Sequence, residues 1–216
     1  MKEGSIIVFL ILCSMIFSVI AGIFSFKKLD AAYKIFLGYM CFSIVGFAIN
    51  FFRHEPVVNN IYNYIFNFVD FEVCFFVFLS FLQSDKKKYW INLSSLAFII
   101  VALAEIYFKG LSTYRESLTS FVFGFINIFT AVIIVSKIGS LESNKRKQIS
   151  KLLILVPFII NITAYIYFNL LLLVLYSPQT APFFIKTQFY LQGIDVVTYI
   201  AFAFAFICLP KKKIFL

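Results

Sequence analysis

The chain has 216 residues, of which 62% are hydrophobic and only 13% are charged, and its mean hydropathy is +0.96. Charged residues make up about a quarter of an ordinary soluble domain, so this composition excludes a soluble protein and predicts a membrane protein. The formal net charge of +9 does not indicate nucleic-acid binding, because the basic residues follow a membrane-topology pattern and form no stripe for one partner.

Seven apolar stretches divide the chain, and each is long enough to cross about 30 Å of hydrocarbon as a helix. Helices are favoured because every backbone group must be satisfied within the span, and the polar alternation of a membrane barrel is absent. The predicted fold class is therefore all-α: one polytopic domain over residues 1-216, with no soluble domain. In chain order, the spans are residues 5-26, 33-52, 61-82, 90-108, 115-138, 151-176 and 183-209.

The first span, residues 5-26, shares some features with a secretory signal peptide, namely Lys2, an apolar run and small residues near Ala21. Cleavage there would export the basic residues that follow and invert the charge bias of the whole chain. We therefore predict that this span is retained as the first helix of the bundle.

The basic residues gather in every second gap between the spans. Cytoplasmic loops retain Lys and Arg, so this bias predicts an outer N-terminus and an inner C-terminus. Lys outnumbers Arg, and Phe, Ile, Asn and Tyr are abundant, which suggests a bacterial source and hence the inner (plasma) membrane. The basic residues on the predicted inner side number 14 of 19 and are Lys27, Lys28, Lys34, Lys86, Lys87, Lys88, Lys137, Lys145, Arg146, Lys147, Lys151, Lys211, Lys212 and Lys213.

Residue types that build cofactor sites are scarce. His54 is the only histidine and falls in an outer loop, so multi-histidine metal centres are excluded and no metal or cofactor is predicted. A retinal protein needs a lysine in the last span, where Tyr199 occupies the corresponding position. The cysteines show no evident pair in an outer loop and are interpreted as small packing residues. They are Cys13, Cys41, Cys74 and Cys208.

Three acidic residues lie well inside predicted spans, away from the span ends: Asp70 and Glu72 in the third and Asp195 in the seventh. A charge at mid-membrane costs about 2.5 kcal/mol or more, so such residues usually face the bundle and mark a site. Counted from the outer loops, Asp70 and Asp195 each lie on the order of 13 Å deep, so they can share one layer. Glu72 is about 200° around the helix from Asp70 and needs a different partner.

Polar side chains extend from both aspartates along one face of each helix, at spacings of three and four residues. We expect these two stripes to face each other across a polar pocket in the outer half of the membrane. A purely structural role, with one carboxyl bonded to the other or to a glutamine, is an equally weighted alternative. The candidate pocket residues are Asn67, Asp70, Glu72, Asn161, Gln188, Gln192 and Asp195.

The other polar residues are predicted to have structural roles. Asn127 and Asn161 lie within spans, where hydrogen bonds between helices of roughly 0.6 kcal/mol explain them. The charged residues near the outer rim are interpreted as a solvated surface with some ion pairs. These rim residues are Arg53, His54, Glu55, Glu105, Lys109, Arg115 and Glu116.

A short internal echo suggests a repeat. Asn67-Phe68-Val69-Asp70 in the third span is similar to Gln192-Gly193-Ile194-Asp195 in the seventh, and both helices run from outside to inside. Two parallel three-helix repeats joined by a fourth helix, as in some small sugar carriers, would give this pattern. The repeat is a hypothesis at this stage.

Two further motifs, Ile65-Phe66-Asn67-Phe68-Val69-Asp70-Phe71 and Ile160-Asn161 followed by Tyr167-Phe168, carry a resemblance. From the second to the seventh span, the chain resembles a loosely defined group of small seven-helix bacterial membrane proteins of unassigned activity, some encoded beside sensor kinases. The resemblance implies a polytopic architecture. The group often has a histidine in its last helix, whereas this chain has none there.

These observations favour a non-enzymatic membrane protein that senses a small ligand, or assembles with a membrane partner or with itself, through the outer-half pocket. The alternative is a small carrier that couples a cation, a proton or a polar solute to Asp70 and Asp195. An intramembrane aspartyl enzyme is a remote third hypothesis, because paired carboxyls can activate water. The residues around Asp195 lack the second glycine of the Gly-x-Gly-Asp motif of such proteases.

Overall fold

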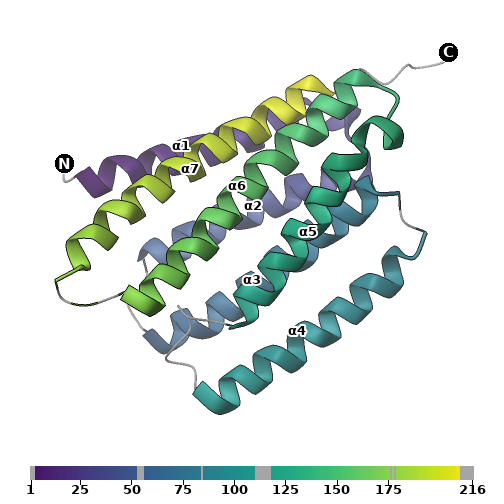
Figure 1. The fold of residues 1–216 in the computed structure, drawn as a ribbon. Helices are drawn as coiled ribbons and strands as arrows, with labels where there is room; N and C mark the ends of the chain where they lie inside the picture. The colour runs from purple at the N-terminus through teal and green to yellow at the C-terminus, as the bar shows by residue number, and fades with distance from the viewer. Residues whose placement is uncertain are drawn as a thin grey trace.

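The computed structural model describes residues 3–52, 56–83, 85–109, 118–175, 177 and 179–209. Within these ranges the chain forms seven α-helices and one short 3-10 turn. The helices lie side by side, and the start of α1 and the end of α7 lie at opposite ends of the bundle (Figure 1). The elements are α1 (Glu3–Phe24), η1 (Phe26–Lys28), α2 (Ala31–Phe52), α3 (Pro56–Phe81), α4 (Lys87–Lys109), α5 (Leu118–Leu141), α6 (Lys145–Leu175) and α7 (Ala181–Cys208).

A helix occupies the position of each predicted span, but several helices are longer than predicted. α3 begins at Pro56 rather than at residue 61, and α6 begins at Lys145 rather than at residue 151. The start of α6 is set by Asn144, whose Oδ1 accepts the backbone N–H groups of Arg146 at 3.0 Å and Lys147 at 3.3 Å. Hydropathy locates the hydrocarbon-length core of a helix, whereas polar caps outside that core set its ends.

Six helices are long and apolar enough to cross a membrane, namely α1, α2, α4, α5, α6 and α7. α3 is not among these six, and the side chains of its first nine residues lie outside what the structure describes. The bundle also carries large apolar side chains on its outside, including Phe24 and Val174. The chain is thus a helical protein suited to multiple membrane crossings, and the seventh crossing remains a prediction.

Six of the helices form a closed ring. α7 packs against α1 and α6, α3 packs against α2 and α5, and the contacts α1 to α2 and α5 to α6 complete the circuit. α4 packs on the outside of the ring, against α3 and α5 (Figure 1). α3 and α7 therefore lie at opposite positions of the ring.

This order of neighbours agrees with the repeat hypothesis. Helices α1 to α3 follow one another around half of the ring, and helices α5 to α7 follow one another around the other half. A twofold rotation about an axis along the bundle would exchange the two halves. α4 would then be the linker, outside both of them. Parallel three-helix repeats have this property.

The end of the ring near η1 and the start of α6 is filled by aromatic packing. Tyr33 contacts Phe81 and Phe206, with ring centroids 5.3 and 6.4 Å apart. The Tyr33 hydroxyl also lies 2.9 Å from Ser150 Oγ, which donates to the carbonyl of Ala205 at 2.7 Å. These contacts join α2, α3, α6 and α7, so this end of the ring is closed by buried side chains.

Candidate functional site

The two aspartates lie at the same level of the ring. Asp70 is 14 residues after Pro56, the first residue of α3, and Asp195 is 14 residues after Ala181, the first residue of α7. At 1.5 Å per residue, each carboxyl is attached about 21 Å from the start of its helix. This is farther than the roughly 13 Å counted from the sequence, because α3 begins at Pro56 and α7 at Ala181, before the predicted spans. Because α3 and α7 are on opposite sides of the ring, the acids approach its centre from opposite walls.

Each aspartate accepts a hydrogen bond from a tyrosine on the preceding helix. The Tyr39 hydroxyl on α2 donates to Asp70 Oδ1, and the Tyr165 hydroxyl on α6 donates to Asp195 Oδ2 at 2.7 Å. The tyrosine precedes its aspartate by 31 residues in the first pair and by 30 in the second. The same polar pair is thus built twice, once in each half of the ring.

Asp195 has a second donor. Asn161 Nδ2 donates to Asp195 Oδ1 at 2.7 Å and lies 3.5 Å from Thr198 Oγ1. The interhelical hydrogen bond predicted for Asn161 is confirmed. In the part of the chain that the structure describes, tyrosine and asparagine side chains donate hydrogen bonds to the two carboxyls.

Two adjoining cavities lie inside the ring. We call the cavity that reaches the start of α7 the outer cavity, and the one around both aspartates the central cavity; their volumes are about 620 and 520 Å³. They share one wall formed by Asn67, Asp70, Asn161, Ile162 and Tyr165. The outer cavity is also lined by Phe71, Phe98, Phe121, Phe123, Gly124, Asn127, Ile166, Phe168, Asn169, Leu172, Ala181, Phe184, Ile185 and Gln188. The central cavity is also lined by Ile11, Met15, Phe36, Tyr39, Ser43, Gly46, Phe47, Phe66, Cys74, Phe158, Asp195, Thr198, Tyr199 and Phe202.

Five of the seven candidate pocket residues line these cavities. Asn67, Asp70 and Asn161 are in the shared wall, Gln188 lines the outer cavity, and Asp195 lines the central cavity. The structure brings these side chains together from α3, α6 and α7. Their function as a site remains a prediction.

Glu72 and Gln192 do not line either cavity. Glu72 points to α4, where Ser94 Oγ donates to its carboxyl oxygens at 3.3 and 3.5 Å. This is the separate partner that its position on the helix predicts, because a residue two positions after Asp70 faces the other side of α3. Gln192 is half-buried on α7.

Sequence reasoning missed the tyrosines of the site. Tyr39 and Tyr165 bind the two aspartates, and Tyr199 lies within electrostatic reach of both. Tyrosine is common in membrane helices, so its presence alone carries little information. The nearly equal spacings from Tyr39 to Asp70 and from Tyr165 to Asp195 are a signal that could have identified the pairs.

The sequence predicts a hydrogen bond between helices for Asn127, and the structure differs from this prediction at the side-chain oxygen. The side chain is only 2% exposed and lines the outer cavity, but its Oδ1 has no hydrogen-bond partner among the described residues. Leaving a buried acceptor unpaired costs about 1–3 kcal/mol. A hydrogen bond between helices therefore does not explain this oxygen.

The prediction of a solvated rim is wrong for Glu105. Its side chain is 6% exposed, and its Oε2 accepts from the Thr119 backbone N–H at 3.1 Å and from Thr119 Oγ1 at 2.6 Å. Thr119 lies at the start of α5, where the unpaired N–H groups and the helix dipole attract a carboxylate. Among the other rim residues, only the helical position of Lys109 is described. Arg53, His54, Glu55, Arg115 and Glu116 lie outside the described residues.

Comparisons with known proteins do not assign this site. No family model, curated protein or solved structure matches the chain.

Proposed function

We propose that this chain is a seven-span protein of a bacterial inner membrane that binds a small polar ligand from the outer side and acts as a sensor, alone or with a membrane partner. The outer cavity is the observation that carries the proposal. Its volume of about 620 Å³ lies within the 300–1,000 Å³ typical of small-molecule sites. Its wall combines apolar rings with a few polar groups, as such sites do.

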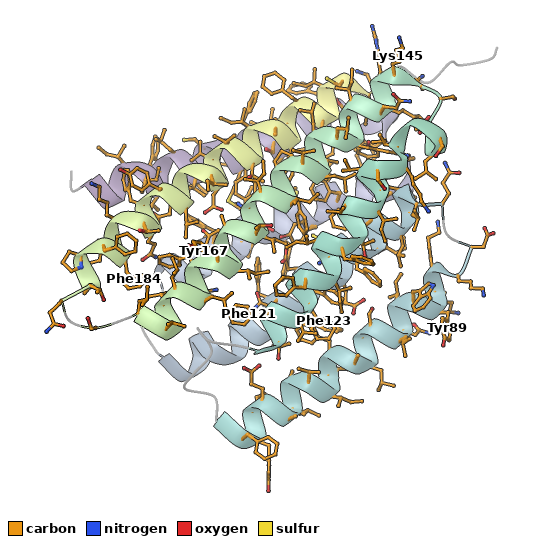
Figure 2. The ribbon with its side chains drawn as sticks, in the orientation of Figure 1. Tyr89, Phe121, Phe123, Lys145, Tyr167 and Phe184 are labelled. Atoms are coloured by element: carbon orange, nitrogen blue, oxygen red, sulfur yellow. The ribbon has the colours of Figure 1, made fainter. Side chains whose placement is uncertain are left out.

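The proposed orientation rests on the distribution of basic residues. The connections at η1, before α4 and before α6 carry Lys27, Lys28, Lys87, Lys145 and neighbouring basic residues. Figure 2 labels Lys145 at the end of the bundle opposite to Phe184. Positive loops stay in the cytoplasm, so this orientation opens the outer cavity toward the outside.

Closure of the inner end favours binding over free passage. The aromatic packing around Tyr33 fills the ring between the central cavity and the inner connections. Lys151 on α6 adds an ion pair with Glu142 at 3.3 Å and lies over the ring of Phe81 at 5.3 Å. In this conformation a ligand that enters the outer cavity reaches Asp70, and the packed inner end blocks further passage.

The proposal is tested by the accessibility of a thiol in the outer cavity. In a variant with all four native cysteines replaced by alanine, Asn169→Cys places a thiol in the cavity wall. We expect a membrane-impermeant maleimide to label it from the outside of intact cells. The matched control is Leu170→Cys, the next residue on α6, which is exposed on the outside of the bundle and would be shielded by lipid. Equal protection of both thiols would contradict an outward-open site.

A carrier is the second candidate function. It is favoured by the shared wall, which places polar side chains of α3 and α6 between the outer cavity and Asp195, and by the repeated Tyr–Asp pair. Transport would require the aromatic packing at the inner end to open. Solute flux into vesicles that is lost in Asp70→Asn would support a carrier and overturn the sensor proposal.

A further inference from the structure

We propose that the ligand of the outer cavity is a small organic ammonium ion, an amine attached to an apolar body, recognised by Asn127 and Asp70. This inference rests on the proposed function, because it names the chemical class of ligand for the same cavity. It is carried by three features of the described wall residues: an acceptor without a partner among them, a carboxyl group with no cation among them, and a set of phenylalanine rings.

The unpaired acceptor calls for a hydrogen-bond donor on the ligand. Asn127 lines the outer cavity from α5, and its buried Oδ1 accepts no hydrogen bond from the part of the chain that the structure describes. Nearly all buried polar atoms in proteins have a partner, and an exception at a site indicates a missing ligand or water. An N–H group supplies the donor that this oxygen lacks.

The carboxyl group selects for positive charge. Asp70 lies in the shared wall, and a carboxylate can accept further hydrogen bonds beyond the one from Tyr39. Asp195 is at the same level in the adjoining cavity. Among the described residues that line the two cavities there is no Lys, Arg or His. An anionic ligand would find no counter-charge among these lining residues, whereas an ammonium ion in the outer cavity would find Asp70, with Asp195 in the adjoining cavity.

The apolar side of the cavity is built from aromatic rings. Phe123 on α5 packs against Phe71 and Phe98, with ring centroids 4.6 and 4.8 Å apart. Phe168 and Phe184 form a second pair at 5.9 Å on α6 and α7. Figure 2 labels Phe123 on α5 and Phe184 on α7, two of the helices that line the cavity. Rings of this kind bury an apolar body and attract a cation to their faces.

Size and geometry favour an organic cation over a metal ion. A volume of about 620 Å³ is far larger than a bare ion requires. In the described part of the chain, no three His, Cys, Asp or Glu side chains gather where they could hold a metal. The ligand must therefore carry a positive charge and also have an apolar body large enough to fill the cavity.

Calorimetric titration of the full chain in phosphatidylcholine nanodiscs tests this inference with three probes of similar shape: 2-phenylethylamine, 2-phenylethanol and 3-phenylpropionate. We expect only the amine to bind. Loss of one charge-assisted hydrogen bond weakens binding about tenfold or more, so Asn127→Leu and Asp70→Asn should each raise the Kd of the amine by this factor. Glu72→Gln is the matched control, because it neutralises an acid on the same helix outside both cavities, and its Kd should equal that of the unmodified chain.

Several outcomes would overturn the ammonium assignment. These are binding of the alcohol or the carboxylate as tightly as the amine, an unchanged Kd in Asn127→Leu, or no binding of any probe at millimolar concentration. If the Asn169→Cys thiol is still labelled from outside in those cases, the cavity is open and only the ligand class is wrong. Absence of labelling would instead refute the proposed function. Asp70→Asn is interpreted only if it elutes as a single species; Asn127→Leu provides the test independently.

Discussion

Replacing Asn127 and Asn161 by leucine, one at a time, should change the stability of the protein in opposite directions. The two residues have the same side chain and lie on adjacent helices, α5 and α6. Asn127 Oδ1 is buried without a partner within the described ranges of the chain, whereas Asn161 Nδ2 donates to Asp195 Oδ1 at 2.7 Å. The same substitution can therefore be compared at an amide whose oxygen lacks a partner among the described residues and at an amide that is hydrogen-bonded.

The expected magnitudes follow from these contacts. Asn127→Leu removes an unpaired buried acceptor, which costs about 1–3 kcal/mol, and the adjoining cavity provides space for the larger side chain. We expect the free energy of unfolding to rise by about 1 kcal/mol or more. Asn161→Leu removes an interhelical hydrogen bond, and such bonds in membranes are worth about 0.6 kcal/mol on average and up to about 1.7. We expect the free energy of unfolding to fall by about 1 kcal/mol.

Reversible unfolding of the purified protein in mixed micelles, titrated with a denaturing detergent, measures both changes. Thr130→Val serves as the control on α5, because Thr130 is nearly buried and its hydroxyl bonds within its own helix at 2.8 Å; little change is expected. A loss of stability in Asn127→Leu equal to that in Asn161→Leu would refute the reasoning, since it would show that Asn127 has a partner in the folded protein.

Three further predictions follow from the topology and the polar contacts. A reporter active only in the cytoplasm should work when fused after Lys147 and fail after Gln179; the reverse result at both positions would overturn the orientation. Asp195→Asn should accumulate in the membrane at close to normal levels, because an amide keeps the shape and accepts one of the two hydrogen bonds, whereas Asp195→Lys should be depleted in immunoblots; equal abundance would contradict a packed site. Glu105→Ala should lower the free energy of unfolding by about 1–3 kcal/mol, because Thr119 loses both of its bonds to Oε2; an unchanged unfolding midpoint would show that this junction is not structurally important.

The sequence by itself determined the class of protein and much of its layout. An apolar span is recognisable from about 20 consecutive residues, because the hydrocarbon imposes a length and excludes unpaired backbone groups. The positions of the helices follow from this local constraint. The same constraint makes the acidic residues within α3 and α7 recognisable as exceptions in apolar spans. The separation of Glu72 from Asp70 also follows, since helical periodicity alone places them on different faces.

Tertiary structure decided which helices are neighbours and which polar groups meet. Tyr39 and Tyr165 gain their significance from the packing of α2 on α3 and of α6 on α7, and hydropathy does not record such contacts. Asn127 and Asn161 are indistinguishable as residues of apolar spans, yet one is unpaired and the other bonds Asp195. Helix packing in a bilayer is set by side-chain fit and hydrogen bonds rather than by a hydrophobic drive between helices. The chain's local pattern therefore specifies the helices, and the contacts between distant residues specify the ring and its cavities.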